Sequence, residues 1–358
     1  MVPITLLPAI VVALLVTISF MLALRPVALS MGLVDKPGGR KLHTGNIPII
    51  GGLAMFIGLS VGILLLGLEL NLFLYVLAAS FLLVVVGVID DCVALPPAAR
   101  MSTQVAVVLI MVYGAHLQLV DMGDPFGTGV ITAGNFMLVF TMLVTITMIN
   151  AYNLIDGVDG LAGSLAIVAL LAIAVAAGIG NPFGAAAMTV AASVFAFLMF
   201  NFPLKWNQSV RSFMGDSGST LLGFSIVWIC IGVSQGEARA ISPVHCLWFA
   251  AIPIFDCLTC FVRRSLKGKS PFTPGRDHFH HTLARGGFGV RQTLGILTGL
   301  QLLYAIIGLT GHFAGLPEYV MFTAWSVLGL SQRSLIRKLA ISHRLHRWKK
   351  VRGGQIAG

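Results

Sequence analysis

Residues 130–180 read VITAGNFMLVFTMLVTITMINAYNLIDGVDGLAGSLAIVALLAIAVAAGIG. Two apolar runs, 130–149 and 161–180, each have the roughly 20 residues that cross a bilayer as a helix. Between them Asn150, Asn153, Asp156 and Asp159 follow one another at intervals of three residues. Ionisable side chains among membrane spans are costly and usually functional. The stretch predicts two membrane helices around a polar functional junction, with Asp156 and Asp159 on one helical face.

The whole chain has the composition of a membrane protein. Of its 358 residues 57% are hydrophobic and 10% are charged, and the mean hydropathy is +0.93. Soluble proteins are about 25% charged, and continuous apolar runs exclude a β-barrel. We expect an all-α polytopic integral membrane protein with about eleven transmembrane helices, at 3–24, 48–68, 71–89, 103–120, 130–149, 161–180, 184–203, 217–235, 241–262, 292–312 and 317–332.

Basic residues give the orientation. If the spans alternate, all of the 23 lysines and arginines except Arg239 fall on one side. Basic loops stay in the cytoplasm, so we expect the N-terminus outside and the C-terminus cytoplasmic. Residues 1–332 would form one transmembrane domain with catalytic loops near 34–50, 90–102, 150–160, 204–217 and 263–291, and 333–358 a basic tail. The net charge of +10 then reflects membrane lipid and no nucleic acid.

The acidic residues are distributed unevenly between the two sides. Five fall in short outer loops, whereas eight lie on the basic side: Asp35, Asp90, Asp91, Asp156, Asp159, Asp216, Asp256 and Asp277. Carboxylates that can hold a cation, beside lysine, arginine and histidine that can hold phosphate, are what a metal–phosphate site needs. We therefore expect the chemistry at the cytoplasmic face.

Two of these acidic motifs have simpler interpretations as well. Asp90 and Asp91 repel each other unless a cation is near, but an acidic pair is also common at a solvated helix end. Asp216 lies in FMGDSGSTLLGF, where Ser217 and Ser219 supply donors and a helix N-terminus could bind an anion. A plain N-cap is the alternative.

The loop SPFTPGRDHFHHTLARGGF, 270–288, contains Arg276, His278, His280 and His281. Arginine beside histidine suits phosphate or sugar-nucleotide binding; a zinc site and a solvated loop are the alternatives. Asp256 is an intramembrane carboxylate with a structural or supporting role. Cys257 and Cys260 form a C-x-x-C inside an apolar span, where buried thiols are a better interpretation than a metal or redox site.

Six blocks together resemble the polyprenyl-phosphate N-acetylhexosamine-1-phosphate transferase superfamily. They follow one another from residue 34 to 281 as VDKPGGRKLHTGNIPIIGGLA, DDCVALPPAAR, NAYNLIDGVDGLAG, FMGDSGSTLLGF, AIPIFDC and SPFTPGRDHFHH. Phe279 interrupts the histidines, which resembles the branch that uses UDP-N-acetylglucosamine rather than a UDP-muramoyl-pentapeptide.

The resemblance implies a reaction at the cytoplasmic face of a bacterial inner membrane. Undecaprenyl phosphate would attack UDP-N-acetylglucosamine, which gives a lipid-linked sugar pyrophosphate and UMP, with Mg²⁺ or Mn²⁺ as cofactor. The product would initiate a surface glycan such as O-antigen. The motifs assign catalysis to Asp90, Asp91, Asp156 and Asp159; the metal to Asp216, Asp156, Asp159 and Asp91; and substrate binding to Lys36, Arg40, His43, Asn153, Arg276, His278, His280 and His281.

Several alternatives stay open from the sequence. Another UDP-N-acetylhexosamine could be the donor, and a covalent intermediate on Asp156 or Asp91 could replace direct transfer. An ion-coupled transporter would also keep intramembrane aspartates, although no repeated halves are visible. A non-catalytic scaffold would tolerate loss of the aspartates. A homodimer is compatible with the sequence.

Overall fold

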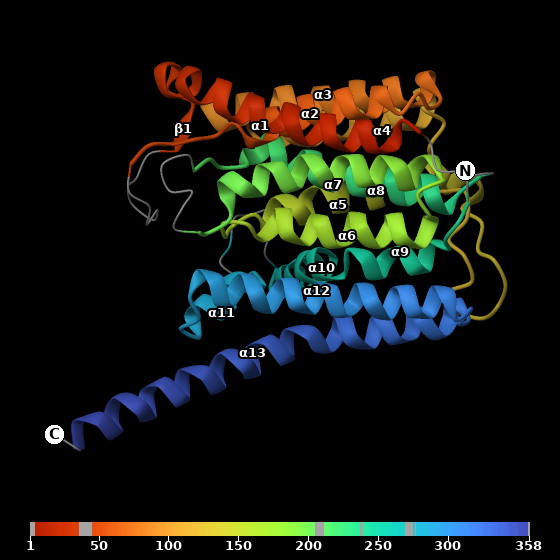
Figure 1. Cartoon of the computed structure of the whole chain (residues 1–358). Helices are drawn as coiled ribbons and strands as arrows, with labels where there is room; N and C mark the ends of the chain where they lie inside the picture. Colours follow the sequence, from red (N-terminus) through yellow and green to blue (C-terminus); the bar gives the residue numbers. More distant parts are fainter. Residues whose placement is uncertain are drawn as a thin grey trace.

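A computed structural model describes residues 4–35, 45–204, 211–236, 239–268, 275 and 277–356, with side chains up to residue 346. The chain runs back and forth as a bundle of helices (Figure 1). In order these are α1 (Leu6–Met31), α2 (Gly51–Leu65), α3 (Leu70–Val93), α4 (Pro97–Leu109) with the π-helical turn η1 (Ile110–Gly114), the 3₁₀ turn η2 (Gly134–Phe136), α5 (Met137–Ile155), α6 (Leu161–Ala177), α7 (Pro182–Asn201), α8 (Gly215–Ser234), α9 (Pro243–Phe249), α10 (Ala251–Ser265), α11 (Phe279–Arg285), α12 (Val290–Phe313) and α13 (Glu318–Ile356). Strands β1 (Val34–Asp35) and β2 (Ile47–Pro48) form a short antiparallel ladder.

The expectation of a helical polytopic membrane protein is confirmed. Among the described residues six helices are long and apolar enough to cross a membrane, or up to seven if α9 and α10 count together as one broken span. The shorter helices α2 and α6 are also apolar. Each of the predicted segments contains a helix, while the number of crossings and their orientation remain predictions.

Two segments differ from the sequence prediction. The expected span 241–262 bends by 89° between α9 and α10, because Gln301 of α12 supplies the hydrogen bonds that a broken helix lacks. Its side chain accepts from the Ile252 N–H at 2.9 Å and donates to the Phe249 carbonyl at 2.7 Å. At the other end, α13 continues without interruption past residue 333, where the separate tail was expected to begin, to Ile356.

Helix α8 is the centre of the bundle, and 94% of its 18-residue apolar stretch is buried. Glycines allow its neighbours to approach closely. A Cβ added at Gly87 of α3 would lie 2.3 Å from Ser217 Cα, and one at Gly52 of α2 would lie 2.3 Å from the Gly218 nitrogen. Backbone contact of this kind excludes any larger residue. The N-terminus of α8 is therefore fixed between α2 and α3, and this position determines the site.

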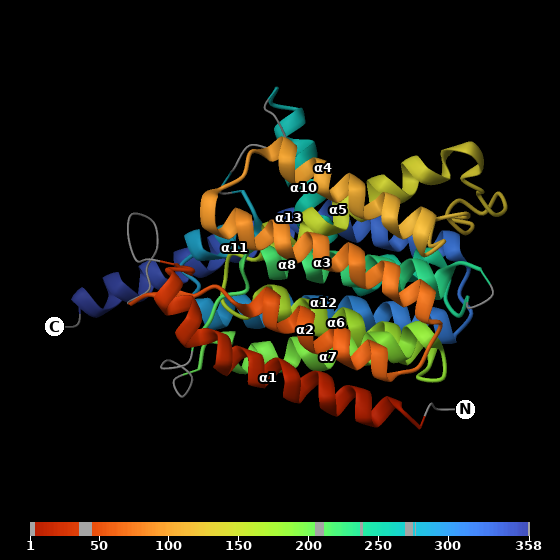
Figure 2. The ribbon, with the colours of Figure 1, turned by 90° about the horizontal axis from the view of Figure 1, so that it is seen from above.

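The loops at the two ends of the bundle differ. Strand β1, helix α11 and the C-terminus lie at one end, and the N-terminus lies at the other (Figure 1). Seen from above, α10 projects away from the bundle beside α4 and α5 (Figure 2). Its bend away from the other helices leaves room for a groove, described below. Large apolar side chains such as Leu15, Phe81 and Leu143 are exposed on the outer helices, as lipid contact requires.

Candidate active site

The junction between α5 and α6 is a tight turn and not a continuous helix. Helix α5 ends at Ile155, and Gly160 has φ +77°, which glycine adopts without strain. The expectation that Asp156 and Asp159 share a helical face is therefore wrong, because α5 ends before both of them and α6 begins after them. Asp159 turns to form an ion pair with Arg211, and the Gly160 N–H donates to the Asn201 side chain at 2.7 Å.

Asp156 lies instead with the carboxylates of neighbouring helices. Burial and the negative charges of Asp216 and Asp91 raise the pKa of the Asp156 carboxyl to about 7. Like charges that are held together in this way favour protonation or a bound cation. This is the environment expected of a site that accepts a metal ion.

Asp91 caps the N-terminus of α8. Its Oδ1 accepts the Asp216 N–H at 2.8 Å, and its Oδ2 accepts the Ser217 hydroxyl at 3.2 Å. Gly215 has φ +73°, and a Cβ there would lie 2.4 Å from Asp91 Oδ2. The anion at this helix N-terminus is therefore a carboxylate of the protein itself, and neither Asp216 nor a serine acts as the cap.

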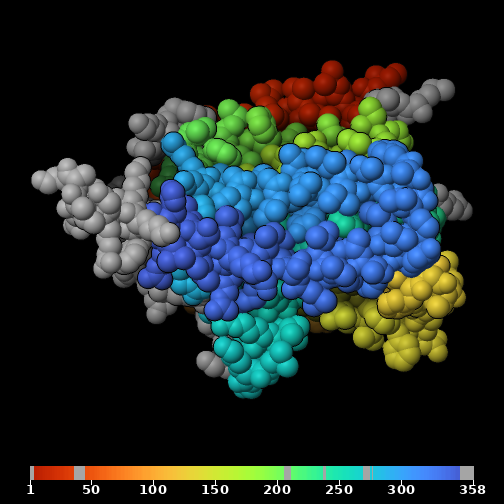
Figure 3. Space-filling view, turned by 90° about the horizontal axis from the view of Figure 1, so that it is seen from below, coloured from red at the N-terminus to blue at the C-terminus, as the bar shows by residue number. Residues whose placement is uncertain are grey.

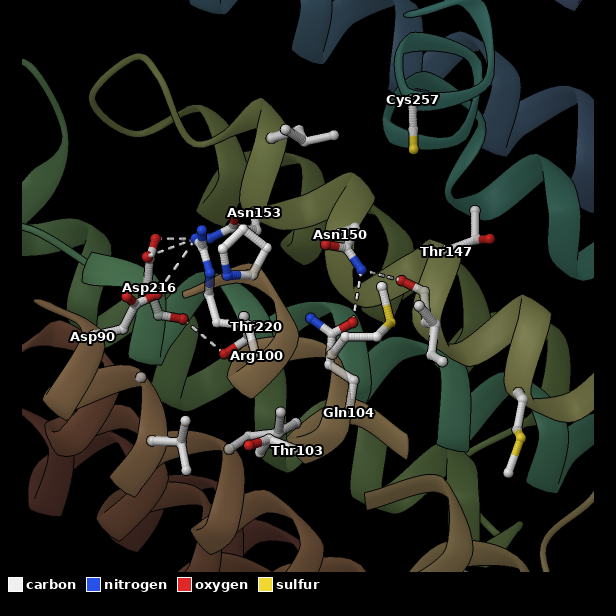
Figure 4. A pocket seen from close by; sticks show the side chains of 18 of the residues that line it. Asp90, Arg100, Thr103, Gln104, Thr147, Asn150, Asn153, Asp216, Thr220 and Cys257 are labelled. Carbon is white, nitrogen blue, oxygen red and sulfur yellow. Dashed lines mark hydrogen bonds and ion pairs between the residues drawn. The ribbon is translucent and has the colours of Figure 1, made fainter. Parts of the chain in front are cut away.

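Asp216 points into a polar cluster at the mouth of a groove (Figure 4). Its Oδ1 accepts the Asn153 amide at 2.8 Å, and its Oδ2 lies 4.0 Å from Arg100 Nη1. The same Arg100 atom lies 3.4 Å from Asp90 Oδ2. Asp90 is buried, and its Oδ2 has no hydrogen-bond donor, although its Oδ1 accepts the Leu95 N–H at 2.6 Å.

These contacts leave acceptor oxygens unused. Among the described residues Arg100 is the one cation paired with Asp90 and Asp216, and Asp91 and Asp156 have no ion pair. Hard carboxylate oxygens with spare acceptor capacity suit Mg²⁺, which keeps several ligand positions for water and phosphate. The donor set therefore fits the expected divalent cation.

The groove combines this polar mouth with a long apolar wall. Its cavity of about 780 Å³ runs between α3, α4, α5, α8 and α10. Asp90, Arg100, Asn153 and Asp216 line one end. Asn150 lies further along the wall, where its amide donates to Gln104 at 2.8 Å (Figure 4). Most of the remaining wall is apolar and includes Leu83, Val86, Val139, Met142, Leu143, Ile146 and Phe261.

His278 is held by Asp256. The buried Asp256 carboxylate accepts His278 Nδ1–H at 2.8 Å and the Phe279 N–H at 2.8 Å, and so fixes the start of α11. Burial opposes charge on His278, but hydrogen bonds to Asp256 and Cys260 outweigh it and raise the pKa of the imidazole to about 10. Asp256, Cys260 and His278 have ligand atoms within 4.8 Å of one another. The Asp256–His278 distance is that of a hydrogen bond, so the pair is satisfied without an ion.

His280 connects the histidine loop to the α5–α6 junction. A Cβ at Gly157 would lie 2.4 Å from His280 Nε2, so the two segments touch. Burial, together with the charges of His281 and His278, lowers the pKa of His280 to about 3, and its ring lies 4.2 Å from that of His281. His280 is therefore neutral at physiological pH and serves as a hydrogen-bonding group, not as a fixed cation.

The structure also shows what the sequence interpretation missed. Lys36, Arg40, His43 and Arg276 lie outside the described residues. Arg100 and Arg211 entered the sequence argument only as charges that set orientation, yet each pairs with a carboxylate of the cluster or of the adjoining turn. The signal for Arg100 was its place in DDCVALPPAAR, where Pro96 and Pro97 turn the chain back on Asp90.

Similarity to known proteins covers this site. Residues 73–234 match the family model described as glycosyl transferase family 4. The chain is 36% identical over 310 residues to the undecaprenyl-phosphate alpha-N-acetylglucosaminyl 1-phosphate transferase of Yersinia pestis, covering 86% of this chain and 85% of that relative. Identity is 35% over 310 residues to proteins of the same name from Escherichia coli K12, with 84% of the relative covered, and Haemophilus influenzae, with 87% covered.

Proposed function

The chain belongs to glycosyl transferase family 4, and we propose that it transfers N-acetylglucosamine 1-phosphate from UDP-N-acetylglucosamine to undecaprenyl phosphate, with release of UMP. The name shared by its relatives supports both substrates. The sequence motifs imply the same reaction. The polar mouth and apolar wall of the groove are the observation that carries the proposal.

The groove suits a lipid phosphate. A polyprenyl phosphate has a long apolar chain and a doubly charged phosphate at one end. The groove is divided in the same way, with apolar side chains such as Leu143 and Phe261 along its wall and the polar cluster around Arg100 at its mouth. Helix α10 leans away from the bundle (Figure 2), and its Phe261 forms part of the apolar wall. We assign the lipid chain to this wall and its phosphate to the mouth, beside Arg100.

The chemistry is one of charge cancellation and alignment. A phosphate monoester has a second pKa near 6 and is mostly ionised at neutral pH, so the acceptor scarcely needs a strong base. It must, however, approach a second anionic phosphate. Arg100 can offset part of this repulsion and, held by Asp90 and Asp216, it has a defined position. Such fixed charges account for most of the catalysis in phosphoryl transfer.

We propose that Asp216 and Asp156, with Asp91 at their side, would hold a divalent cation. Mg²⁺ or Mn²⁺ bound there would supply positive charge for the phosphates and for the leaving UMP. Asp159 is engaged by Arg211, so we now assign it to the shape of the α5–α6 turn. Asp90 orients Arg100 through Oδ2, which accepts no hydrogen bond, and we assign the role of proton acceptor to this carboxylate.

The donor would enter from the side of α11. His280 contacts Gly157 in the turn that also carries Asp156, so a pyrophosphate between these segments could accept hydrogen bonds from His280 and His281. Asn153 fixes Asp216 through its amide. A covalent intermediate on Asp91 is disfavoured, because both of its oxygens are occupied by the start of α8.

We also propose eleven crossings of a bacterial inner membrane, with the N-terminus outside and the site in the cytoplasm. The alternation of the helices along the bundle (Figure 1) and the uneven distribution of lysine and arginine among the loops of the sequence support this topology. An ion-coupled transporter is less consistent with a cluster at one end of the bundle. A homodimer stays a prediction.

The test is release of UMP by the purified protein from UDP-N-acetylglucosamine and undecaprenyl phosphate, with Mg²⁺, with Mn²⁺ and with EDTA. We expect release that requires both the lipid and the metal. The same assay with UDP-N-acetylgalactosamine determines donor choice. Absence of UMP from every UDP-sugar, in protein with a normal melting transition, would contradict the transferase and favour transport.

A further inference from the structure

A second pocket lies on the far side of α11 from the acidic cluster. It has a volume of about 510 Å³ and is bounded by the end of α10, by α11 and by the outer part of α13. From below, α12 and α13 cover this face and α10 projects beside them (Figure 3). The pocket is lined by six cationic side chains, Arg263, Lys267, Arg285, Arg333, Arg337 and Arg344.

The positive charge in this pocket is not neutralised by the protein. Asp277 is the single carboxylate of the lining, and it pairs with Arg263 at 2.8 Å. Over the described part of the chain, Lys267, Arg337 and Arg344 have no ion pair. Cations gathered at this density repel one another, and an anion between them removes the repulsion.

The base of the pocket is apolar. Phe279, Ile336 and Ala340 are buried there beneath the cations. Close by, Leu266 is 83% exposed, and Ile341 of the lining is 49% exposed, so apolar surface continues outward from the pocket on α13 and after α10. An occupant with a phosphate and an acyl chain meets both surfaces, whereas a soluble anion leaves the apolar surface in water.

Helix α11 connects the pocket to the acidic cluster. Its Phe279 and Thr282 line the pocket, while His280 faces the other way and touches Gly157. Gly286, at the end of α11, packs on Ala340 of α13, and its carbonyl accepts His343 Nδ1–H at 3.1 Å. Anything that ties the arginines of α13 to α11 therefore also fixes the histidines.

We propose that this pocket binds the phosphate of an anionic phospholipid, and that the bound lipid holds α11 in the position the site uses. The first half is independent of the reaction. The second half rests on the proposed function. Anionic headgroups are the phosphates available at a cytoplasmic membrane surface, where they attract clustered lysine and arginine side chains.

The test compares two neighbouring residues. Arg337 lines the pocket and Lys338 does not, so Arg337→Gln/Arg344→Gln and Lys338→Gln remove charge from the same helix at different places. Each full-length protein is placed in phosphatidylcholine nanodiscs with and without phosphatidylglycerol, and retained phosphatidylglycerol is measured by native mass spectrometry. We expect roughly tenfold weaker retention in the double variant, and nearly normal retention in Lys338→Gln.

Three other outcomes would overturn the binding half: equal loss in Lys338→Gln, unchanged retention in the double variant, or displacement of the lipid by inorganic phosphate at low concentration. The last would identify a free-anion site. UMP release in the same nanodiscs tests the second half, and phosphatidylglycerol should stimulate the wild type but not the double variant. If no protein releases UMP while lipid retention follows the prediction, the proposed reaction fails and the binding site stands.

Discussion

Polar clusters occupy both ends of the bundle, and they are built differently. At the end near the N-terminus, Asp121 pairs with Arg239 at 2.9 Å, and Gln235 Oε1 accepts the Asp121 N–H at 3.1 Å. Glu318 lies 3.9 Å from the same arginine and accepts the Asp124 N–H at 2.9 Å. At the other end, Asp90 and Asp216 share one cation, Arg100, while Asp91 and Asp156 have no ion pair among the described residues.

The difference separates structural from functional charge. In the Asp121–Arg239 cluster the carboxylates are paired with an arginine and accept backbone hydrogen bonds, so the cluster joins the loop to α13 and requires no ligand. The carboxylate cluster leaves oxygens unused and raises the pKa of Asp156 to about 7 through burial and repulsion. Unfavourable electrostatics of this kind are kept where a ligand later relieves them. Substitutions in the carboxylate cluster should therefore reduce UMP release strongly, whereas those in the Asp121–Arg239 cluster should leave it nearly unchanged.

The largest effect is expected at Asp216. Asp216→Asn keeps the shape of the side chain and an acceptor for Asn153, but it removes the charge that we assign to the metal. UMP release should fall at least about a hundredfold, because fixed charge at the phosphates is a major part of catalysis. Glu69→Gln, an exposed carboxyl at the other end, is the matched control and should retain normal turnover. Near-normal turnover in Asp216→Asn would remove Asp216 from the proposed metal site.

Asp256 should give the next largest effect. It does not line the groove but holds His278 and the start of α11, so Asp256→Asn should displace His280 and lower kcat/KM by roughly ten- to a hundredfold. Cys260→Ala is the control, since its sulfur lies 3.6 Å from His278 and makes a weak contact. Equal losses in the two variants would favour a metal site of Asp256, Cys260 and His278.

The same pair predicts a pH dependence of stability. The pKa of His278 rises from 6.5 unfolded to about 10 folded. Its contribution to the free energy of unfolding is therefore complete below pH 6.5 and disappears as pH rises through about 10. The melting temperature of the wild type should fall over this pH range, and that of Asp256→Asn should fall less. Parallel curves for the two proteins would argue against the ion pair.

A smaller effect of opposite sign is expected at Asp156. The pKa of its carboxyl is about 7 folded and 3.8 in the reference state, so between these values the folded protein keeps a proton that the unfolded chain releases. Stability is therefore lost as pH rises through about 7. In EDTA near pH 8, Asp156→Asn should be more stable than wild type by about 1 kcal/mol after allowance for screening; this difference should shrink as pH falls below about 7 and vanish near pH 4, while UMP release is lost. A less stable variant at both pH values would contradict the repulsion.

The sequence could predict the helices and the end of the bundle at which the carboxylates gather. Long apolar runs specify membrane helices, and loop charge separates the two ends. The sequence could not predict the partner or the role of each individual carboxylate. Asp91 caps a helix through the N–H of Asp216, 125 residues later, and Asp159 is engaged by Arg211, 52 residues away. Such partners are brought together by packing, which local spacing does not contain.

The bend between α9 and α10 has the same origin. Residues 241–262 read as one apolar span with Pro253 inside it, and a proline permits a break but does not require one. The break is stabilised by Gln301, buried in α12 and about 50 residues distant. A lone glutamine in an apolar run gives no local sign of its partner. The groove, which depends on this bend, could therefore not be predicted from the sequence.

The smallest effect is expected in the Asp121–Arg239 cluster, and this prediction is the sharpest test of the difference between the two ends. Arg239→Gln removes the cation of Asp121 and Glu318 while the amide can still donate to Asp121. Exposed pairs contribute at most about 1 kcal/mol, so the melting temperature should fall slightly, and UMP release should stay within about twofold of wild type. Asp121→Asn should give the same small loss, and the two together little more, since they break one contact. If Arg239→Gln instead abolished UMP release in folded protein, charge at that end would serve the reaction, and the distinction between the two clusters would have to be abandoned.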